Sequence, residues 1–136
     1  MNENQLQIVN YSQAVLLRKF GFDWECNRYY YGYPQTKLNP KGLPNLGYCE
    51  KRNSNITKGN YSAPTVALAL KWFRDVKGIG CSVTQVISIG KKSTYYSYSY
   101  NLTYGCQFSI DRFDTYESAE NALLDELLNL LEQEKS

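Results

Sequence analysis

A chain of 136 residues with 43% hydrophobic residues is long enough to form one globular domain around its own core, without cross-links to hold it together. Lys and Arg (15) nearly balance Asp and Glu (13), the net charge is +2, and histidine is absent. No apolar run approaches the length of about 20 residues that a transmembrane helix needs. The absence of histidine removes the side chain most often used for acid–base catalysis.

The N-terminal residues 1–10 are polar and lack the apolar segment of a secretory signal, so we expect a cytoplasmic protein. Cysteines are seldom paired in such a reducing compartment. The four present are widely spaced and form no CxxC pair: Cys26, Cys49, Cys81 and Cys106. We therefore expect free, buried or half-buried thiols, with no disulfide framework, no zinc site and no cofactor.

The first half of the chain predicts one helix and one strand before a long connection. The helix covers 12–20, with Ser12 as its N-cap and the following glycine as its stop. Aromatic residues over 26–31 predict a strand, because aromatic side chains favour extended backbone. Residues 34–61 are rich in Pro, Gly and Asn and predict a long connection, in which a short strand over 46–50 is the one element expected.

The second half of the chain changes its hydrophobic period twice. Apolar residues recur at helical spacing over 62–76, alternate over 81–110, and return to helical spacing over 116–131. Turns within the alternating part separate three strands, at about 80–89, 96–102 and 106–110. The last helix is expected to begin after an N-cap at Asp114 or Thr115.

These elements predict an α+β fold in a single domain, residues 1–136. The alternation is what an antiparallel sheet shows when one face packs on helices and the other meets water. We expect a sheet of three to four strands with the helices packed on one face, and the strand near Tyr29 as its fourth member. An exposed edge of that sheet leaves homo-oligomer formation open.

Charge is distributed unevenly along the chain. Residues 111–136 contain eight acids and two bases, a net charge of −6, whereas residues 1–110 contain 13 bases and five acids, a net charge of +8. One interpretation is ordinary solvated surface charge. The other is a protein with two electrostatic faces, a basic body and an acidic C-terminal helix.

Motifs for catalysis are missing from the sequence. There is no GxSxG, no glycine-rich phosphate loop and no metal triad. Asp23 and Glu25 alternate on an extended segment, which suggests either a glycosidase-like pair or simple surface charge. We favour surface charge, and we expect a protein that is not an enzyme.

Tyrosines are the strongest functional candidates, because 13 of them are present. The candidate binding residues combine aromatic rings with basic neighbours: Arg28, Tyr29, Tyr30, Tyr31, Tyr33, Lys91 and Lys92. Such sets stack bases and hold phosphates, and tyrosine is also a preferred anchor at protein interfaces. Tyr96, Tyr98 and Tyr100 have a simpler interpretation, which is that they line the core face of a strand. The run 29–31 cannot face one way, so at least one of its rings is expected to point outward or into a second contact.

The order helix–strand–strand–strand–helix over 62–131 resembles the double-stranded RNA-binding domain in topology. That family holds RNA through a basic cluster at the start of its last helix. The matching stretch here, Glu117-Ser118-Ala119-Glu120, is acidic and would repel phosphate. The resemblance therefore implies the fold without duplex RNA binding.

A second resemblance covers about residues 11–31 and 62–132. It is carried by Ser12-Gln13-Ala14 with Phe20-Gly21-Phe22-Asp23, by Ala63-Pro64-Thr65 with Lys71-Trp72-Phe73-Arg74, and by Tyr116-Glu117-Ser118-Ala119-Glu120. These motifs are similar to those of small uncharacterised cytosolic proteins of Bacteroidetes and their phages. The resemblance implies an accessory protein of bacterial or phage origin and carries no catalytic residue across.

We therefore expect a non-enzymatic binding or accessory protein that recognises a protein partner through exposed tyrosines. The alternative is a nucleic-acid-binding protein that uses its basic, tyrosine-rich surface.

Overall fold

The computed structural model describes residues 7–31, 45–56, 60–88, 90, 93–103 and 105–134. Its backbone divides into two compact units, Met1–Thr65 and Val66–Ser136. The single domain expected over residues 1–136 stays a prediction.

The first unit opens with helix α1 (Tyr11–Lys19). Its N-cap is Asn10, whose side-chain oxygen accepts a hydrogen bond from the Gln13 backbone N–H at 2.8 Å. The Gln13 side chain accepts one from the Asn10 N–H at 2.9 Å in return. The prediction of Ser12 as the cap was wrong, because this reciprocal pair satisfies two free N–H groups and starts the helix earlier.

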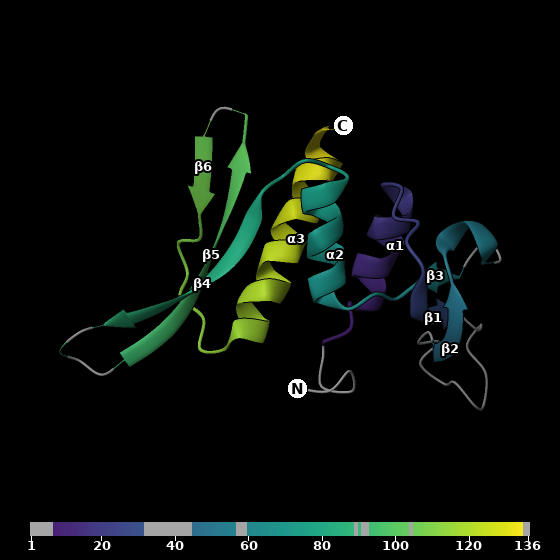
Figure 1. Ribbon diagram of the computed structural model, residues 1–136, viewed down its shortest axis with the longest axis horizontal. Helices are drawn as coiled ribbons and strands as arrows, with labels where there is room; N and C mark the ends of the chain where they lie inside the picture. Colours follow the sequence, from purple (N-terminus) through teal and green to yellow (C-terminus); the bar gives the residue numbers. More distant parts are fainter. Residues whose placement is uncertain are drawn as a thin grey trace. The chain divides into compact units, whose positions relative to one another are not determined.

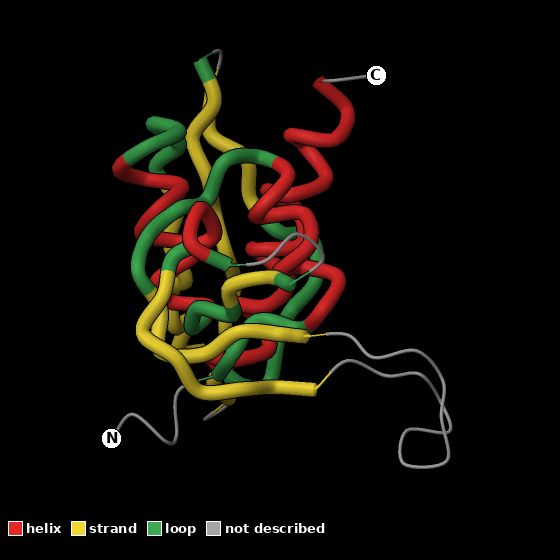
Figure 2. The backbone as a smooth tube through the Cα atoms, turned by 90° about the vertical axis from the view of Figure 1, so that its right-hand side faces the viewer, coloured by secondary structure: helices red, strands yellow, loops and turns green. Residues whose placement is uncertain are grey.

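Three antiparallel strands form the sheet of the first unit, in the order β2-β1-β3. Strand β1 (Cys26–Tyr31) pairs with β2 (Asn45–Lys51) on one side and with β3 (Tyr61–Ser62) on the other. Figure 1 labels these elements, and Figure 2 shows β1 and β2 side by side. The strand predicted over 46–50 is therefore confirmed.

The strand near Tyr29 forms, but it is not the fourth strand of the later sheet. Its hydrogen-bonding partners come from the segment predicted as a connection, where β2 and β3 flank the short 3₁₀ turn Asn53–Asn55. A strand so close in sequence closes a shorter loop than a strand from the second half of the chain would.

Asn53 connects the parts of the first unit from a buried position. Its side-chain N–H donates to the Phe22 carbonyl at 2.6 Å, and its side-chain oxygen accepts from the Ser62 N–H at 2.9 Å. Both polar ends of a buried amide are thus satisfied, which removes the penalty of burying it.

The second unit contains two helices and a sheet in the order β4-β5-β6. Its elements are α2 (Val66–Asp75), β4 (Cys81–Ser88), β5 (Ser93–Leu102), β6 (Gly105–Phe108) and α3 (Tyr116–Glu134). Helix α2 begins later than predicted, because Ser62 belongs to β3. Gly78, at φ 71°, provides the left-handed residue that ends the helix. The α+β fold class is confirmed.

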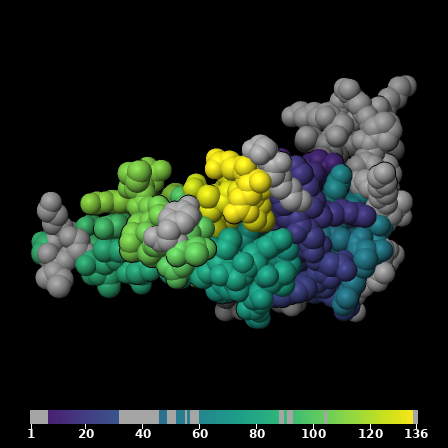
Figure 3. All heavy atoms as spheres, turned by 90° about the horizontal axis from the view of Figure 1, so that it is seen from above, coloured from purple at the N-terminus to yellow at the C-terminus, as the bar shows by residue number. Residues whose placement is uncertain are grey.

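One face of the second sheet packs on the helices. The Tyr100 hydroxyl donates to the Glu126 carboxylate of α3 at 3.1 Å, and the Tyr96 ring meets the Tyr116 ring edge-on at 6.0 Å. Figure 3 shows α3 beside the strands and α2. Buried leucines cover the inner side of α3: Leu123, Leu124, Leu127, Leu128 and Leu131.

The third strand does not bury its apolar residues. Phe108 is 73% exposed, Ile110 is 99% exposed, and Cys106, predicted to be buried or half-buried, is exposed. The pairing register explains this, because Phe108 lies opposite Ser99 and so shares the face away from Tyr98 and Tyr100.

The start of α3 decides between the two predicted caps. Thr115 Oγ1 accepts a hydrogen bond from the Ser118 N–H at 3.1 Å, so Thr115 is the N-cap.

Candidate functional site: the tyrosine strand of the first unit

The structure describes four of the seven candidate binding residues, and strand β1 positions all four. Tyr33, Lys91 and Lys92 lie outside the described residues. Successive side chains alternate across a strand, so Arg28 and Tyr30 lie on one face of the sheet, and Tyr29 and Tyr31 on the other.

Arg28 pairs with Tyr48 of β2, its partner in the strand register. The guanidinium carbon lies 4.5 Å from the centre of the Tyr48 ring, and Nη2 donates to the Tyr48 hydroxyl at 3.0 Å. Tyr48 nevertheless remains 73% exposed. A cation–π contact and a hydrogen bond thus fix the orientation of an aromatic ring that faces solvent.

The sequence prediction missed Tyr48 as a site residue, because it lies in the segment assigned to a connection. The signal that points to it is the strand expected over 46–50, which places Leu46 and Tyr48 on the same face. Leu46 is also exposed, at 40%. An exposed apolar and an exposed aromatic side chain therefore lie on the same face of β2, opposite Tyr30 and Arg28 of β1.

Tyr30 has a structural role. Its hydroxyl donates to the Val9 carbonyl at 2.7 Å, and its ring meets that of Tyr11 edge-on at 5.8 Å. Burial raises the pKa of the Tyr30 phenol. This side chain ties β1 to the segment before α1.

Tyr29 and Tyr31 lie together on the opposite face, with ring centres 5.5 Å apart. Both rings cover Gly47 of β2. A Cβ placed on Gly47 would come within 2.8 Å of Tyr31 Cε1 and 3.0 Å of Tyr29 Cε1. Glycine here allows the close approach of two aromatic rings, and a larger residue would force a ring to shift.

The tyrosines of β5 are divided between its two faces. Tyr96, Tyr98 and Tyr100 face α3, as the simpler interpretation of their alternation expects. Tyr95 lies on the other face, where the guanidinium carbon of Arg112 stands 4.5 Å from its ring centre. This second arginine–tyrosine pair provides an internal comparison for Arg28 and Tyr48.

Asp23 and Glu25 have different surroundings. The Asp23 carboxylate accepts a hydrogen bond from the Ser54 N–H at 2.7 Å, and Glu25 is exposed. Asp23 thus holds the 3₁₀ turn in place.

Within the described ranges, no group of three or more acidic or cysteine side chains is arranged to hold a metal ion. The same residues include no helix with the length and apolarity needed to cross a bilayer. Comparisons with protein-family models, curated proteins and solved structures gave no match.

Proposed function

We propose that this protein is a non-enzymatic binding protein that recognises a protein partner through Arg28, Leu46 and Tyr48, here called the Arg28–Tyr48 surface. The observation that carries the proposal is the exposed Tyr48 ring, oriented by Arg28. Tyrosine and arginine are the residues that most often dominate binding energy at protein interfaces. A ring already fixed in place loses little conformational entropy on binding.

The position of Tyr48 supports this choice. Strand β2 is at the edge of its sheet, so among the described strands its outer side has no partner. An edge strand with exposed Leu46 and Tyr48 offers both apolar surface and backbone hydrogen-bonding groups to another chain. The accessory role in a bacterium or phage implied by the resemblance, and a cytoplasmic location, belong to the same proposal.

Nucleic-acid binding is the second candidate. Residues 1–65 contain eight bases and four acids, and the Arg28–Tyr48 pair combines a cation with a ring able to stack on a base. The two candidates differ in their response to salt, because phosphate contacts weaken steeply as salt rises.

The test is affinity capture of the tagged protein from a lysate of the cells that produce it, with and without nuclease. We expect a protein partner that survives nuclease and is lost in the double variant Arg28→Gln, Tyr48→Ala. The matched control is Arg112→Gln, Tyr95→Ala, which removes the equivalent pair from the second unit and should leave capture unchanged. Equal capture by both double variants contradicts the proposed surface, and capture that nuclease abolishes favours nucleic acid.

A further inference from the structure

A pocket of about 390 Å³ lies within the second unit, between α2, β4 and α3. This volume falls in the range of roughly 300–1,000 Å³ typical of small-molecule sites. Apolar side chains, including Leu70 and Val83, line one part of it. Arg74, Tyr116 and Glu120 provide polar groups in the same pocket. None of these residues takes part in the proposed protein surface.

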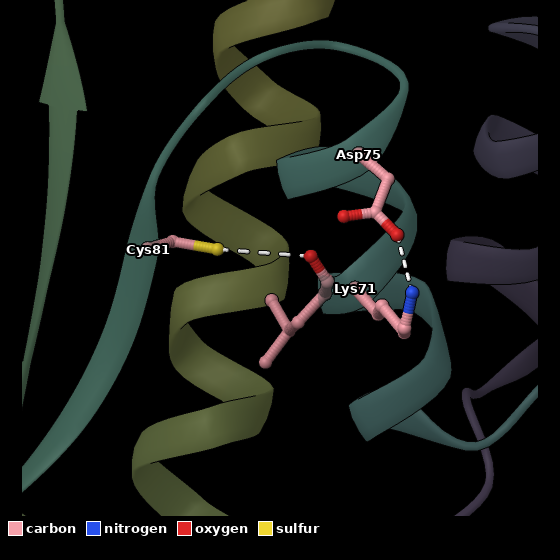
Figure 4. Close-up of polar contacts among 4 residues, drawn as sticks. Lys71, Asp75 and Cys81 are labelled. Atoms are coloured by element: carbon pink, nitrogen blue, oxygen red, sulfur yellow. Dashed lines mark hydrogen bonds and ion pairs between the residues drawn. The ribbon is translucent and has the colours of Figure 1, made fainter.

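Contacts with Cys81 hold Arg74 at the pocket wall. Its Nη1 donates to the Cys81 carbonyl at 3.3 Å and lies 3.8 Å from the Cys81 sulfur. The Cys81 thiol in turn donates to the Leu70 carbonyl at 3.8 Å. Figure 4 shows this sulfur pointing from β4 toward α2. The positive charge of Arg74 is thus positioned by contacts that do not neutralise it.

Glu120 brings a negative charge to the same pocket from α3. Burial raises the pKa of its carboxyl group, the neighbouring Glu117 raises it further, and Arg74 opposes both effects. No ion pair within 4 Å joins Arg74 and Glu120. Two opposite charges therefore line one pocket without forming a direct ion pair.

We propose that this pocket binds a free α-amino acid with an aliphatic side chain. The ligand carboxylate would accept hydrogen bonds from Arg74, and its ammonium group would donate to Glu120. The aliphatic side chain would lie against Leu70 and Val83. A ligand with only one of the two charges is disfavoured, because an anion meets Glu120 and a cation meets Arg74.

The experiment is an NMR titration of the ¹⁵N-labelled full chain with three probes of similar shape. These are L-leucine, 4-methylpentanoate, which lacks the ammonium group, and 3-methylbutylamine, which lacks the carboxylate. We expect L-leucine to shift the amide signals of pocket residues, and both single-charge probes to bind at least about tenfold more weakly, because each leaves a charged wall unpaired.

Variants assign the binding to the two charged walls. Arg74→Gln and Glu120→Gln should each remove the preference for L-leucine over the single-charge probe that lacks the matching group. Lys71→Gln is the control on α2, since Lys71 pairs with Asp75 on the side of that helix away from Cys81 (Figure 4). Glu132→Gln is the control on α3.

Two results overturn the proposal. One is the absence of shifts at the pocket residues with L-leucine at millimolar concentration, and the other is equal binding of all three probes. Arg74→Gln also removes the contacts to Cys81. If that variant fails to fold, the comparison of the three probes with the parent protein and with Glu120→Gln still tests the proposed pocket.

Discussion

Arg28 and Tyr48 are neighbours across two strands and far apart in the sequence, so their role appears only when the register of β1 and β2 is known. The other described residues of the tyrosine run have distinct tasks. Tyr30 is held by the Val9 carbonyl, and Tyr29 and Tyr31 cover Gly47. The run of adjacent tyrosines therefore serves stability on both faces of the sheet, while the exposed ring comes from β2.

Gly47→Ala should destabilise the protein by about 1–3 kcal/mol, because the added methyl group overlaps the Tyr29 and Tyr31 rings. Chemical denaturation measures the change. Removing one ring makes room, so Tyr31→Ala together with Gly47→Ala should cost less than the sum of the two single changes. If the free-energy costs of the two single changes simply added up in the double variant, the close contact between Gly47 and the Tyr31 ring would be contradicted.

Cys26 and Cys106 should differ strongly in reactivity. Burial, and secondarily the nearby Glu25, raises the pKa of the Cys26 thiol to about 12, so almost none of it is thiolate near pH 8. Cys106 is exposed. Iodoacetamide at pH 8 should therefore label Cys106 much faster than Cys26, as read by peptide mapping. Similar labelling rates for the two thiols would contradict the burial of Cys26.

The raised pKa of Glu120 makes a prediction about stability and pH. A carboxyl group whose pKa is higher in the folded state favours folding while protonated, and this contribution is lost as pH rises through the folded pKa. Glutamine cannot ionise, so replacing Glu120 by Gln avoids this loss of stability at high pH. Glu120→Gln should thus be more stable than the parent at pH 7, by no more than about 1 kcal/mol for a partly solvated group.

The advantage of Glu120→Gln should shrink as pH falls through the raised pKa of the folded carboxyl group, and it should vanish below the pKa of the unfolded one. Denaturation curves of both proteins at pH 7 and at acidic pH measure the stability difference at each pH. If the stability advantage of Glu120→Gln grew toward low pH, the pKa of Glu120 would be lowered by folding, not raised.

At the scale of elements, local signals predicted the helices and missed details of the sheets. The stop of α2 at Gly78 depends on neighbouring residues alone, so the sequence is sufficient to place it. The pairing of β1 with β2 depends on a contact between distant segments. The face on which Phe108 lies depends on register, and neither property is visible in a hydrophobic pattern.

The candidate site shows the same division. Arg28 and the tyrosine run were identified from composition and alternation, which are local properties. Tyr48 was not, because its importance comes from lying opposite Arg28 in the neighbouring strand. The pocket beside Arg74 was missed for the same reason, since α2, β4 and α3 each contribute only part of it.

The cap of α1 provides a direct test at the element scale. Asn10→Ala should cost about 1 kcal/mol, because it removes the hydrogen bond to the Gln13 N–H. Ser12→Ala lies inside the helix and should cost much less. Thermal or urea denaturation of both variants measures the difference, and a larger cost for Ser12→Ala would support the cap predicted from the sequence instead.

At the scale of the whole molecule, the two units carry different candidate sites. The first unit offers an aromatic and basic surface at Arg28 and Tyr48, and the second offers a pocket with opposite charges on its walls. The charges of the chain follow this division, because residues 1–65 contain eight bases and four acids, whereas residues 66–136 contain seven bases and nine acids. Recognition of a partner by the first unit is the central claim.

The most direct test of that claim is the affinity of the captured partner for Tyr48→Ala and for the matched control Tyr95→Ala. We expect Tyr48→Ala to weaken binding by about 2 kcal/mol, roughly thirtyfold, as for an interface residue that dominates the binding energy. Tyr95→Ala should bind as the parent protein does. Equal affinity of the two variants would contradict the assignment of partner recognition to the Arg28–Tyr48 surface.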